Sequence, residues 1–174
     1  MVCLEYLEEK DFTSVVEWNR DTTADFLYQW AGRGYEFPLT EEKVRQRFLD
    51  GANREGSDTF IYRIILRETG EMIGTVELFK IDRTTGEATV GRFLLDSRHR
   101  GKGYGQQALK ALVDLAFGEL GLKKLYLAVF DFNLSAIACY EKVGFRKECF
   151  IPDMYQTAEG PWGMYRMALA IEGS

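Results

Sequence analysis

The sequence predicts an α/β fold in which helices pack on a mixed β-sheet, and two observations carry that prediction. Three strand-like segments, at residues 59–67, 72–81 and 87–95, follow one another with short turns between them, which is the pattern of an antiparallel meander. The third segment leads through a helical pattern into a further strand at 124–130. A strand, helix, strand passage requires a parallel pair joined by a right-handed crossover, so the sheet is mixed.

Length and composition are those of one ordinary domain, expected to span residues 1–174. The chain is 46% hydrophobic and 28% charged, which is sufficient for a full core. Its start has no basic segment followed by a long apolar stretch, so we expect no signal peptide or membrane span, and a cytoplasmic protein. Cys3, Cys139 and Cys149 are too scattered for a disulfide framework or a zinc site, and no metal is expected. The basic residues form no extended stripe, so no nucleic-acid binding is expected.

The N-terminal third predicts a strand and two helices before the meander. Residues 1–7 alternate like a strand, and Asp11 offers an N-cap for a short helix. Residues 19–35 are irregular and dense in aromatic side chains, which suits either the wall of an acceptor pocket or plain core packing. Thr40 is expected to cap a helix that runs to about Asn53.

The elements after the meander are read from apolar runs and from the glycines that stop them. The continuous apolar run at 124–130 predicts a strand buried on both faces. In order, the predicted elements are a helix over 106–120, the strand over 124–130, a helix over 133–144, a strand from Phe145, a loop over 151–160 and a final strand over 162–171.

A glycine-rich turn joins the third meander strand to the next helix, within the stretch 93–105. Gly101, Gly103 and Gly105 stand at alternate positions, where they permit backbone conformations closed to other residues and let a ligand lie against the main chain. The first amides of the helix that follows lack acceptors and have the positive end of the helix dipole behind them. The turn is therefore a candidate site for an anion such as a pyrophosphate.

Positive charge is concentrated in this turn, although the whole chain has a formal net charge of -5. The contrast predicts an anionic ligand held at one place. A Walker loop needs Ser or Thr where Tyr104 stands, and the dinucleotide fingerprint needs a differently placed third glycine, so neither fits. A tight turn without a ligand is the structural alternative. The basic side chains are those of Arg98, Arg100 and Lys102.

A second motif follows the strand at 124–130. Asn133 stands at a helix entrance, and Tyr140 lies two helical turns further, so both can face one side of the helix about 10 Å apart. The two motifs read R-x-x-G-x-G at 98–103 and N-x-x-A-x-x-x-Y-x-x-x-G-F at 133–145. In this order they resemble the acetyl-CoA loop and the second motif of the GNAT superfamily of N-acetyltransferases.

The resemblance implies a mixed, mostly antiparallel sheet with helices on both faces, and direct attack of an amine on the thioester of acetyl-CoA. The pantetheine arm would bond to the strand that ends at Leu95 like an added strand, and the pyrophosphate would bind the amides of the turn. The implied cosubstrate-binding residues are Phe93, Leu94, Leu95, Arg98, Arg100, Gly101, Lys102, Gly103, Tyr104, Gly105 and Asn133.

The resemblance also suggests catalytic roles. Tyr140 is expected to protonate the leaving thiolate, the alternative being a core tyrosine on an amphipathic helix. An amide of Leu94 or Leu95 would stabilise the oxyanion, which is worth about 3 kcal/mol when well aimed. Glu77, in an otherwise apolar strand, is the candidate general base, directly or through water, and the alternative is an exposed cross-strand partner for an arginine or lysine. His99 is assigned to the backbone of the turn and not to catalysis.

The whole-chain pattern looks closest to the branch with ribosomal-protein alanine and spermidine acetyltransferases. The acceptor would then be a protein or peptide N-terminal α-amine or a small cationic amine, and the acidic net charge of -5 favours a cation. Gly163 and Ser97 depart from this branch, where aspartate and proline are common. A non-catalytic acyl-CoA sensor with the same fold is the alternative function. Relatives are often dimers, and an aromatic C-terminal hairpin would supply the interface of a homodimer.

Overall fold

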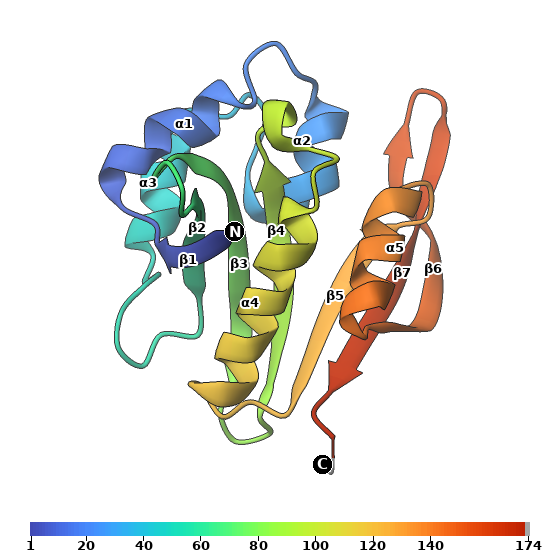
Figure 1. Ribbon diagram of the computed structural model, residues 1–174. Coiled ribbons are helices and arrows are strands. Elements are labelled where there is room, and N and C mark those ends of the chain that lie inside the picture. Colours follow the sequence, from blue (N-terminus) through green and yellow to red (C-terminus); the bar gives the residue numbers. More distant parts are fainter. Residues whose placement is uncertain (173–174) are drawn as a thin grey trace.

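The structure, a computed structural model, describes residues 1–172. Its described strands are β1 (Val2–Tyr6), β2 (Phe60–Leu66), β3 (Met72–Asp82), β4 (Glu87–Leu95), β5 (Lys124–Phe130), β6 (Arg146–Thr157) and β7 (Gly160–Ala170). They form one sheet in the order β1-β2-β3-β4-β5-β7-β6 (Figure 1). Neighbours are antiparallel except β4 and β5, which are parallel. The predicted mixed, mostly antiparallel sheet is confirmed.

Helices cover both faces of this sheet, as expected. The α-helices are α1 (Phe12–Glu17), α2 (Ala24–Ala31), α3 (Glu41–Leu49), α4 (Tyr104–Gly118) and α5 (Leu134–Val143), and the 3-10 turns are η1 (Glu9–Asp11), η2 (Gly32–Gly34) and η3 (Ser97–His99). The apolar sides of α4 and α5 join the larger buried cluster, whereas α1 and α3 join a smaller one. Strand β2 separates the two, because Ile64 belongs to the larger cluster and Ile61 to the smaller.

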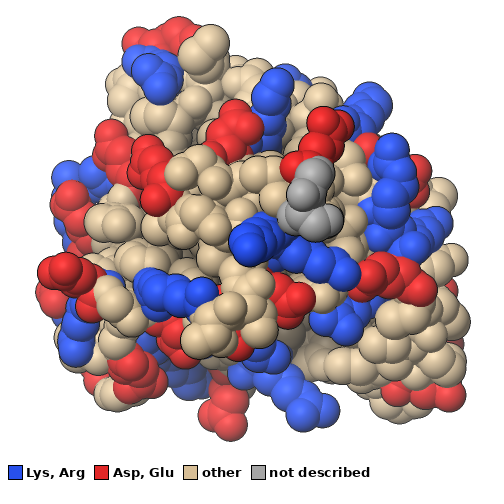
Figure 2. Space-filling view, turned by 90° about the horizontal axis from the view of Figure 1, so that it is seen from below, with Lys and Arg blue, Asp and Glu red and all other residues tan. Residues whose placement is uncertain are grey.

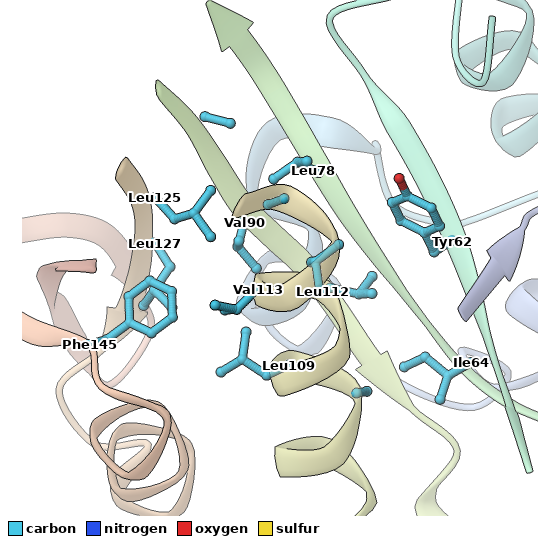
Figure 3. Close-up of a cluster of buried hydrophobic side chains, with 14 of the residues drawn as sticks. Tyr62, Ile64, Leu78, Val90, Leu109, Leu112, Val113, Leu125, Leu127 and Phe145 are labelled. Carbon is cyan, nitrogen blue, oxygen red and sulfur yellow. The ribbon is translucent and has the colours of Figure 1, made fainter. Parts of the chain in front are cut away.

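The larger core fixes the position of α4 on the sheet. Leu109 and Leu112 of α4 are fully buried against side chains such as Leu78 of β3 and Leu125 of β5 (Figure 3). Burying each such leucine stabilises the fold by about 2 kcal/mol relative to leaving it exposed. The N-terminus of α4, where the glycine-rich turn ends, is therefore held in a fixed place above β4.

The parallel pairing between β4 and β5 is short. Only the pairs Glu87↔Lys124, Ala88↔Leu125 and Thr89↔Tyr126 are made, and beyond them the two strands diverge (Figure 1). On the side that faces β5, the rest of β4 up to Leu95 has no strand partner among residues 1–172. The sheet thus contains an opening with a free strand edge.

A β-bulge lies in β4 at this opening. The register changes from Thr75↔Leu94 to Glu77↔Gly91, so β4 carries one residue more than β3 over this interval. Arg92 takes the extra position with a left-handed φ of 47°. The bulge changes the direction of the free edge and turns the Arg92 side chain toward Glu77 and Gly34.

Several sequence predictions were wrong in detail. The stretch 19–35 contains the regular helix α2, which Thr23 caps by accepting a hydrogen bond from the Phe26 amide at 3.1 Å. The buried residues Leu27 and Ala31 lie one helical turn apart, but the many aromatic residues around them made this spacing hard to recognise in the sequence. The loop expected over 151–160 is mostly strand β6, and its loop-like composition reflects a bulge in which Asp153 has a φ of 53°.

Strand β5 is not buried on both faces, because its burial alternates along the strand and Ala128 is exposed. Helix α3 ends at Leu49, before the predicted Asn53, because Gly51 has a φ of 121° that helical geometry does not allow. Helix α4 begins at Tyr104, two residues earlier than predicted. No helix within residues 1–172 is long and apolar enough to cross a membrane. The single domain over 1–174 stays a prediction.

Candidate functional site

The glycine loop, defined as residues 98–105, connects η3 to α4. Gly101 and Gly103 have left-handed φ values of 75° and 83°, and a Cβ atom at either would have no atom within 4 Å, so the loop is open above both. Gly103 is the N-cap of α4 and has no side chain to bond the free amides. The amides of Tyr104, Gly105 and Gln106 are the first three of α4 and have no acceptor within the helix. This arrangement suits an anion.

The basic side chains of the glycine loop differ in their partners. Arg98 donates to the Asp96 carboxylate from Nε at 3.0 Å and from Nη2 at 2.6 Å, while its side chain remains 73% exposed. Asp96 is only 4% exposed. Burial acts to raise the pKa of Asp96, but the hydrogen bonds from Arg98 outweigh it, and this pKa lies below its usual range. Lys102 is exposed, with no ion pair within the described residues.

Arg100 joins the glycine loop to the free edge of β4. Its Nε and Nη2 atoms donate to the carbonyl oxygen of Leu95 at 3.2 and 3.0 Å. The guanidinium also lies 5.6 Å from the ring centroid of Phe26 on α2. The Arg100 side chain therefore lies where a ligand that bonded to this carbonyl would also reach.

The main chain of Leu94 is fixed from the opposite side. Gly74 of β3 approaches so closely that a Cβ atom there would lie 2.3 Å from the Leu94 carbonyl oxygen. Asp96 also donates its amide to the Ile73 carbonyl at 2.8 Å. The predicted residues Phe93, Leu94 and Leu95 thus lie together at the opening on a backbone anchored to β3.

Asn133 and Tyr140 lie on the other side of the opening, on α5, which follows β5 and packs against α4 (Figure 1). Asn133 caps α5, its Oδ1 accepting from the Ala136 amide at 3.4 Å. Tyr140 packs against the larger core and near the Phe145 ring. Burial raises the pKa of Tyr140, and Cys139 acts in the same direction. The phenol therefore keeps its proton at neutral pH.

Glu77 is buried, at 2% exposure, and not exposed as the alternative interpretation held. The other part of that alternative, pairing with an arginine, is present. Arg47 of α3 binds the Glu77 carboxylate, and Nη1 of Arg92 donates to it at 3.4 Å. The ring of Tyr35 lies beside Arg47. Guanidinium donors thus take up the oxygens that a general base would need, and the role of Glu77 as base stays a prediction.

An aromatic cluster that sequence reasoning did not identify connects α2 to the ends of β5, β6 and β7. The Tyr28 and Tyr155 rings lie 3.9 Å apart, and the Tyr155 hydroxyl donates to Asp25 at 2.8 Å. Trp162 contacts both Tyr155 and Phe130, the last residue of β5. The aromatic residues within 19–35 were expected to form either a pocket wall or core packing, and Tyr155 was not included because it was assigned to a loop.

Potential metal ligands gather at one place among residues 1–172. Ligand atoms of Glu71, Asp96 and His99 lie within 4.8 Å of one another. The Arg98 Nη2 atom lies 2.6 Å from Asp96 and 3.7 Å from Glu71, so a cation is already present. The two ring nitrogens of His99 also face different carboxylates. We interpret the group as an ion-pair network and not as a metal site.

A hollow of about 550 Å³ adjoins the glycine loop, between η3 and the α1–α2 region. Trp18 and Phe26 form its apolar lining, and Arg98 and Arg100 reach it from the loop.

On the molecular face drawn in Figure 2, acidic and basic side chains are interspersed. The cysteines Cys3, Cys139 and Cys149 are free thiols, as expected.

Comparison with known proteins gives a consistent result. Residues 24–145 match the Acetyltransferase (GNAT) family. The chain is 33% identical over 125 residues to the probable N-acetyltransferase YjcK of Bacillus subtilis, covering 71% of this chain and 69% of that protein. It is 30% identical over 164 residues to the spermidine N(1)-acetyltransferase of Escherichia coli, covering 90% of this chain and 82% of that protein.

The fold is also that of a solved acetyltransferase. The spermidine N-acetyltransferase of Vibrio cholerae in complex with CoA and spermine superposes with a TM-score of 0.83 at 20% identity, covering 97% of this chain and 95% of that one. Fold, motifs and sequence similarity thus agree, and the chain belongs to the GNAT family of acetyltransferases.

Proposed function

We propose that this protein transfers the acetyl group of acetyl-CoA to an amine of a small polyamine. The observation that carries the proposal is the free edge of β4, which ends directly at the glycine loop. An extended arm with amide groups can pair with that edge while a pyrophosphate at its end meets the free amides of α4. Acetyl-CoA has both parts in this order.

The cosubstrate would lie in the opening between β4 and β5. Its pantetheine would bond the main chain of Phe93 to Leu95, with Arg100 released from the Leu95 carbonyl to the pyrophosphate. Arg98 and Lys102 would add positive charge, and the amides from Gly101 to Gly105 would bind the phosphate oxygens. The Asn133 side chain would hold the pantetheine or an ordered water.

Acetyl transfer needs one new bond and two proton movements. The neutral amine nitrogen attacks the thioester carbon, the carbon–sulfur bond breaks, and sulfur leaves as a thiolate that takes the phenolic proton of Tyr140. The amine loses a proton to a base, for which Glu77 is the candidate. Burial raises the pKa of Tyr140, so the phenol is protonated in the resting state, but the same shift makes it a weaker acid toward the thiolate.

A polyamine is the acceptor that charge and relatives favour. The net charge of -5 attracts cations. The E. coli relative is named for spermidine, and the V. cholerae structure contains spermine. An N-terminal α-amine is the second candidate acceptor. The named acetyltransferase relatives favour catalysis over an acyl-CoA sensor.

An acceptor panel tests this proposal. The protein is incubated with acetyl-CoA and, separately, with spermidine, spermine, an aminoglycoside and a peptide that begins with alanine, while free thiol is measured and products are weighed by mass spectrometry. We expect thiol release and an acetylated product with the polyamines. Transfer only to the peptide would overturn the acceptor assignment. Binding of acetyl-CoA without transfer to any acceptor would favour the sensor.

The homodimer stays a prediction. Strand β6 is an edge of the sheet and is largely exposed, including Phe150. Light scattering coupled to gel filtration would measure the mass directly, and a monomeric mass at working concentration would contradict the prediction.

A further inference from the structure

We propose that His99 and Glu71 are positioning residues for the glycine loop, and that protonation of His99 strengthens acetyl-CoA binding. The proposal rests on the acetyl-CoA binding proposed above. His99 lies at the start of the glycine loop, whereas Glu71 directly precedes β3 and is distant in sequence. Contact between them ties the loop to the meander.

The geometry places the imidazole between two carboxylates. Nδ1 of His99 lies 3.5 Å from Oδ2 of Asp96, and Nε2 lies 3.5 Å from Oε2 of Glu71. The side chain is 12% exposed, and Nδ1 is buried without a hydrogen-bond partner. An imidazolium has a donor on each nitrogen, whereas neutral imidazole has only one. Only the protonated ring can therefore serve both carboxylates.

His99 stands at one end of the glycine loop, and its ring lies near the other end. Its amide donates to the Asp96 carbonyl at 2.9 Å, and its ring lies 6.4 Å from the ring of Tyr104, the first residue of α4. The charged and titratable groups that face it are Asp96 and Arg98 of the η3 segment, Glu71 before β3, and Tyr104 of α4. The imidazole thus lies between Asp96 and Tyr104, which stand on either side of the backbone whose amides would bind the pyrophosphate.

Protonation strengthens cosubstrate binding in two ways. An imidazolium that donates from both nitrogens holds the loop in place, so the loop loses less conformational entropy when the ligand binds. The added positive charge would also attract an anionic ligand bound at the loop. Once the proton is lost, one nitrogen presents a lone pair to a carboxylate and that contact becomes repulsive.

Titration calorimetry with acetyl-CoA alone, without an acceptor, tests this inference at pH 5.5 and pH 8. We expect the dissociation constant of the wild type to rise about fivefold more over this interval than that of His99→Gln, which is the size of a partly exposed charge pair. Protonation of the ligand's own phosphate affects both proteins equally, so it cancels when the two changes in dissociation constant are compared. In two buffers of different ionisation enthalpy, the wild type should take up more protons on binding than His99→Gln.

Two further variants separate positioning from general electrostatics. Glu71→Gln should lose about half of the pH effect while remaining folded, because Glu71 is partly exposed. Glu68→Gln is the matched control, since it removes a carboxylate three residues away that pairs with the N-terminus and not with His99. Parallel pH profiles for wild type and His99→Gln would overturn this inference alone. Absence of wild-type binding at both pH values would overturn it together with the proposed function.

Discussion

The Glu77 carboxylate on β3 is held at two points by Arg47 on α3, with Nε donating to Oε2 at 3.3 Å and Nη2 donating to Oε1. Arg92, the left-handed residue of the β4 bulge, donates to the same carboxylate. Its guanidinium also lies 4.1 Å from the Phe79 ring centroid. One buried carboxylate thus joins a helix, a strand and the bulge beside the opening.

Glu77→Gln should lower the free energy of unfolding by about 3 kcal/mol, because two partly buried guanidinium groups lose their counter-ion. Urea denaturation measures this. If Glu77 is also the base, kcat of the folded variant should fall about 100-fold. Arg47→Met is the matched control, since it breaks the ion pair but keeps the carboxylate. Equal losses of kcat in the two variants would contradict the base assignment.

Tyr140→Phe should lower kcat about 100-fold and leave the KM for acetyl-CoA nearly unchanged, because only the proton donated to the leaving thiolate is lost. Steady-state kinetics with spermidine would measure both constants. Tyr62→Phe is the control, since Tyr62 is also a buried tyrosine of raised pKa but lies on β2, away from the opening. Full activity in Tyr140→Phe would refute the acid assignment.

Gly103→Asp should abolish measurable acetyl-CoA binding, because the carboxylate repels the pyrophosphate and a left-handed φ of 83° strains any side chain. Gly103→Ala separates these causes, since it carries the strain alone, about 1 kcal/mol or a several-fold loss of affinity. Calorimetry of both variants gives the comparison. Equal affinities of the aspartate and alanine variants would show that no anion lies at this turn.

Stability should fall above about pH 10, the usual pKa of tyrosine. Burial raises the pKa of Tyr35, Tyr62 and Tyr140 in the folded state. Above that pH the unfolded chain releases protons that the folded chain retains, so the free energy of unfolding decreases as pH rises. Urea midpoints at pH 8 and pH 10.5 measure the slope. Tyr62→Phe should reduce the slope of stability against pH, and an unchanged slope would contradict a raised pKa of Tyr62.

The conformation of the glycine loop was predictable from sequence because it depends on local backbone geometry. Gly101 and Gly103 have the left-handed conformations that the motif requires, and both follow directly from residue type and spacing. The meander and its parallel neighbour were predictable for a similar reason, since short turns and a crossover helix allow few topologies.

The environment of Glu77 was not predictable, because it depends on contacts between distant segments. Its partner Arg47 lies thirty residues away in sequence, on a helix whose position over β3 is a property of the tertiary fold. The pairing of Asp25 with Tyr155 spans 130 residues and is of the same kind. The bulge in β4 places its left-handed φ on Arg92 and not on the neighbouring Gly91, so residue type did not indicate it.

The parallel seam between β4 and β5 divides the sheet into two blocks that share three residue pairs. A seam so short is mechanically weak, and we expect the blocks to move against each other more than any other neighbouring strands do. A molecule bound along the free edge of β4 would contact both blocks and hold them together. Binding of the cosubstrate would then reduce the motion of the meander relative to the C-terminal hairpin.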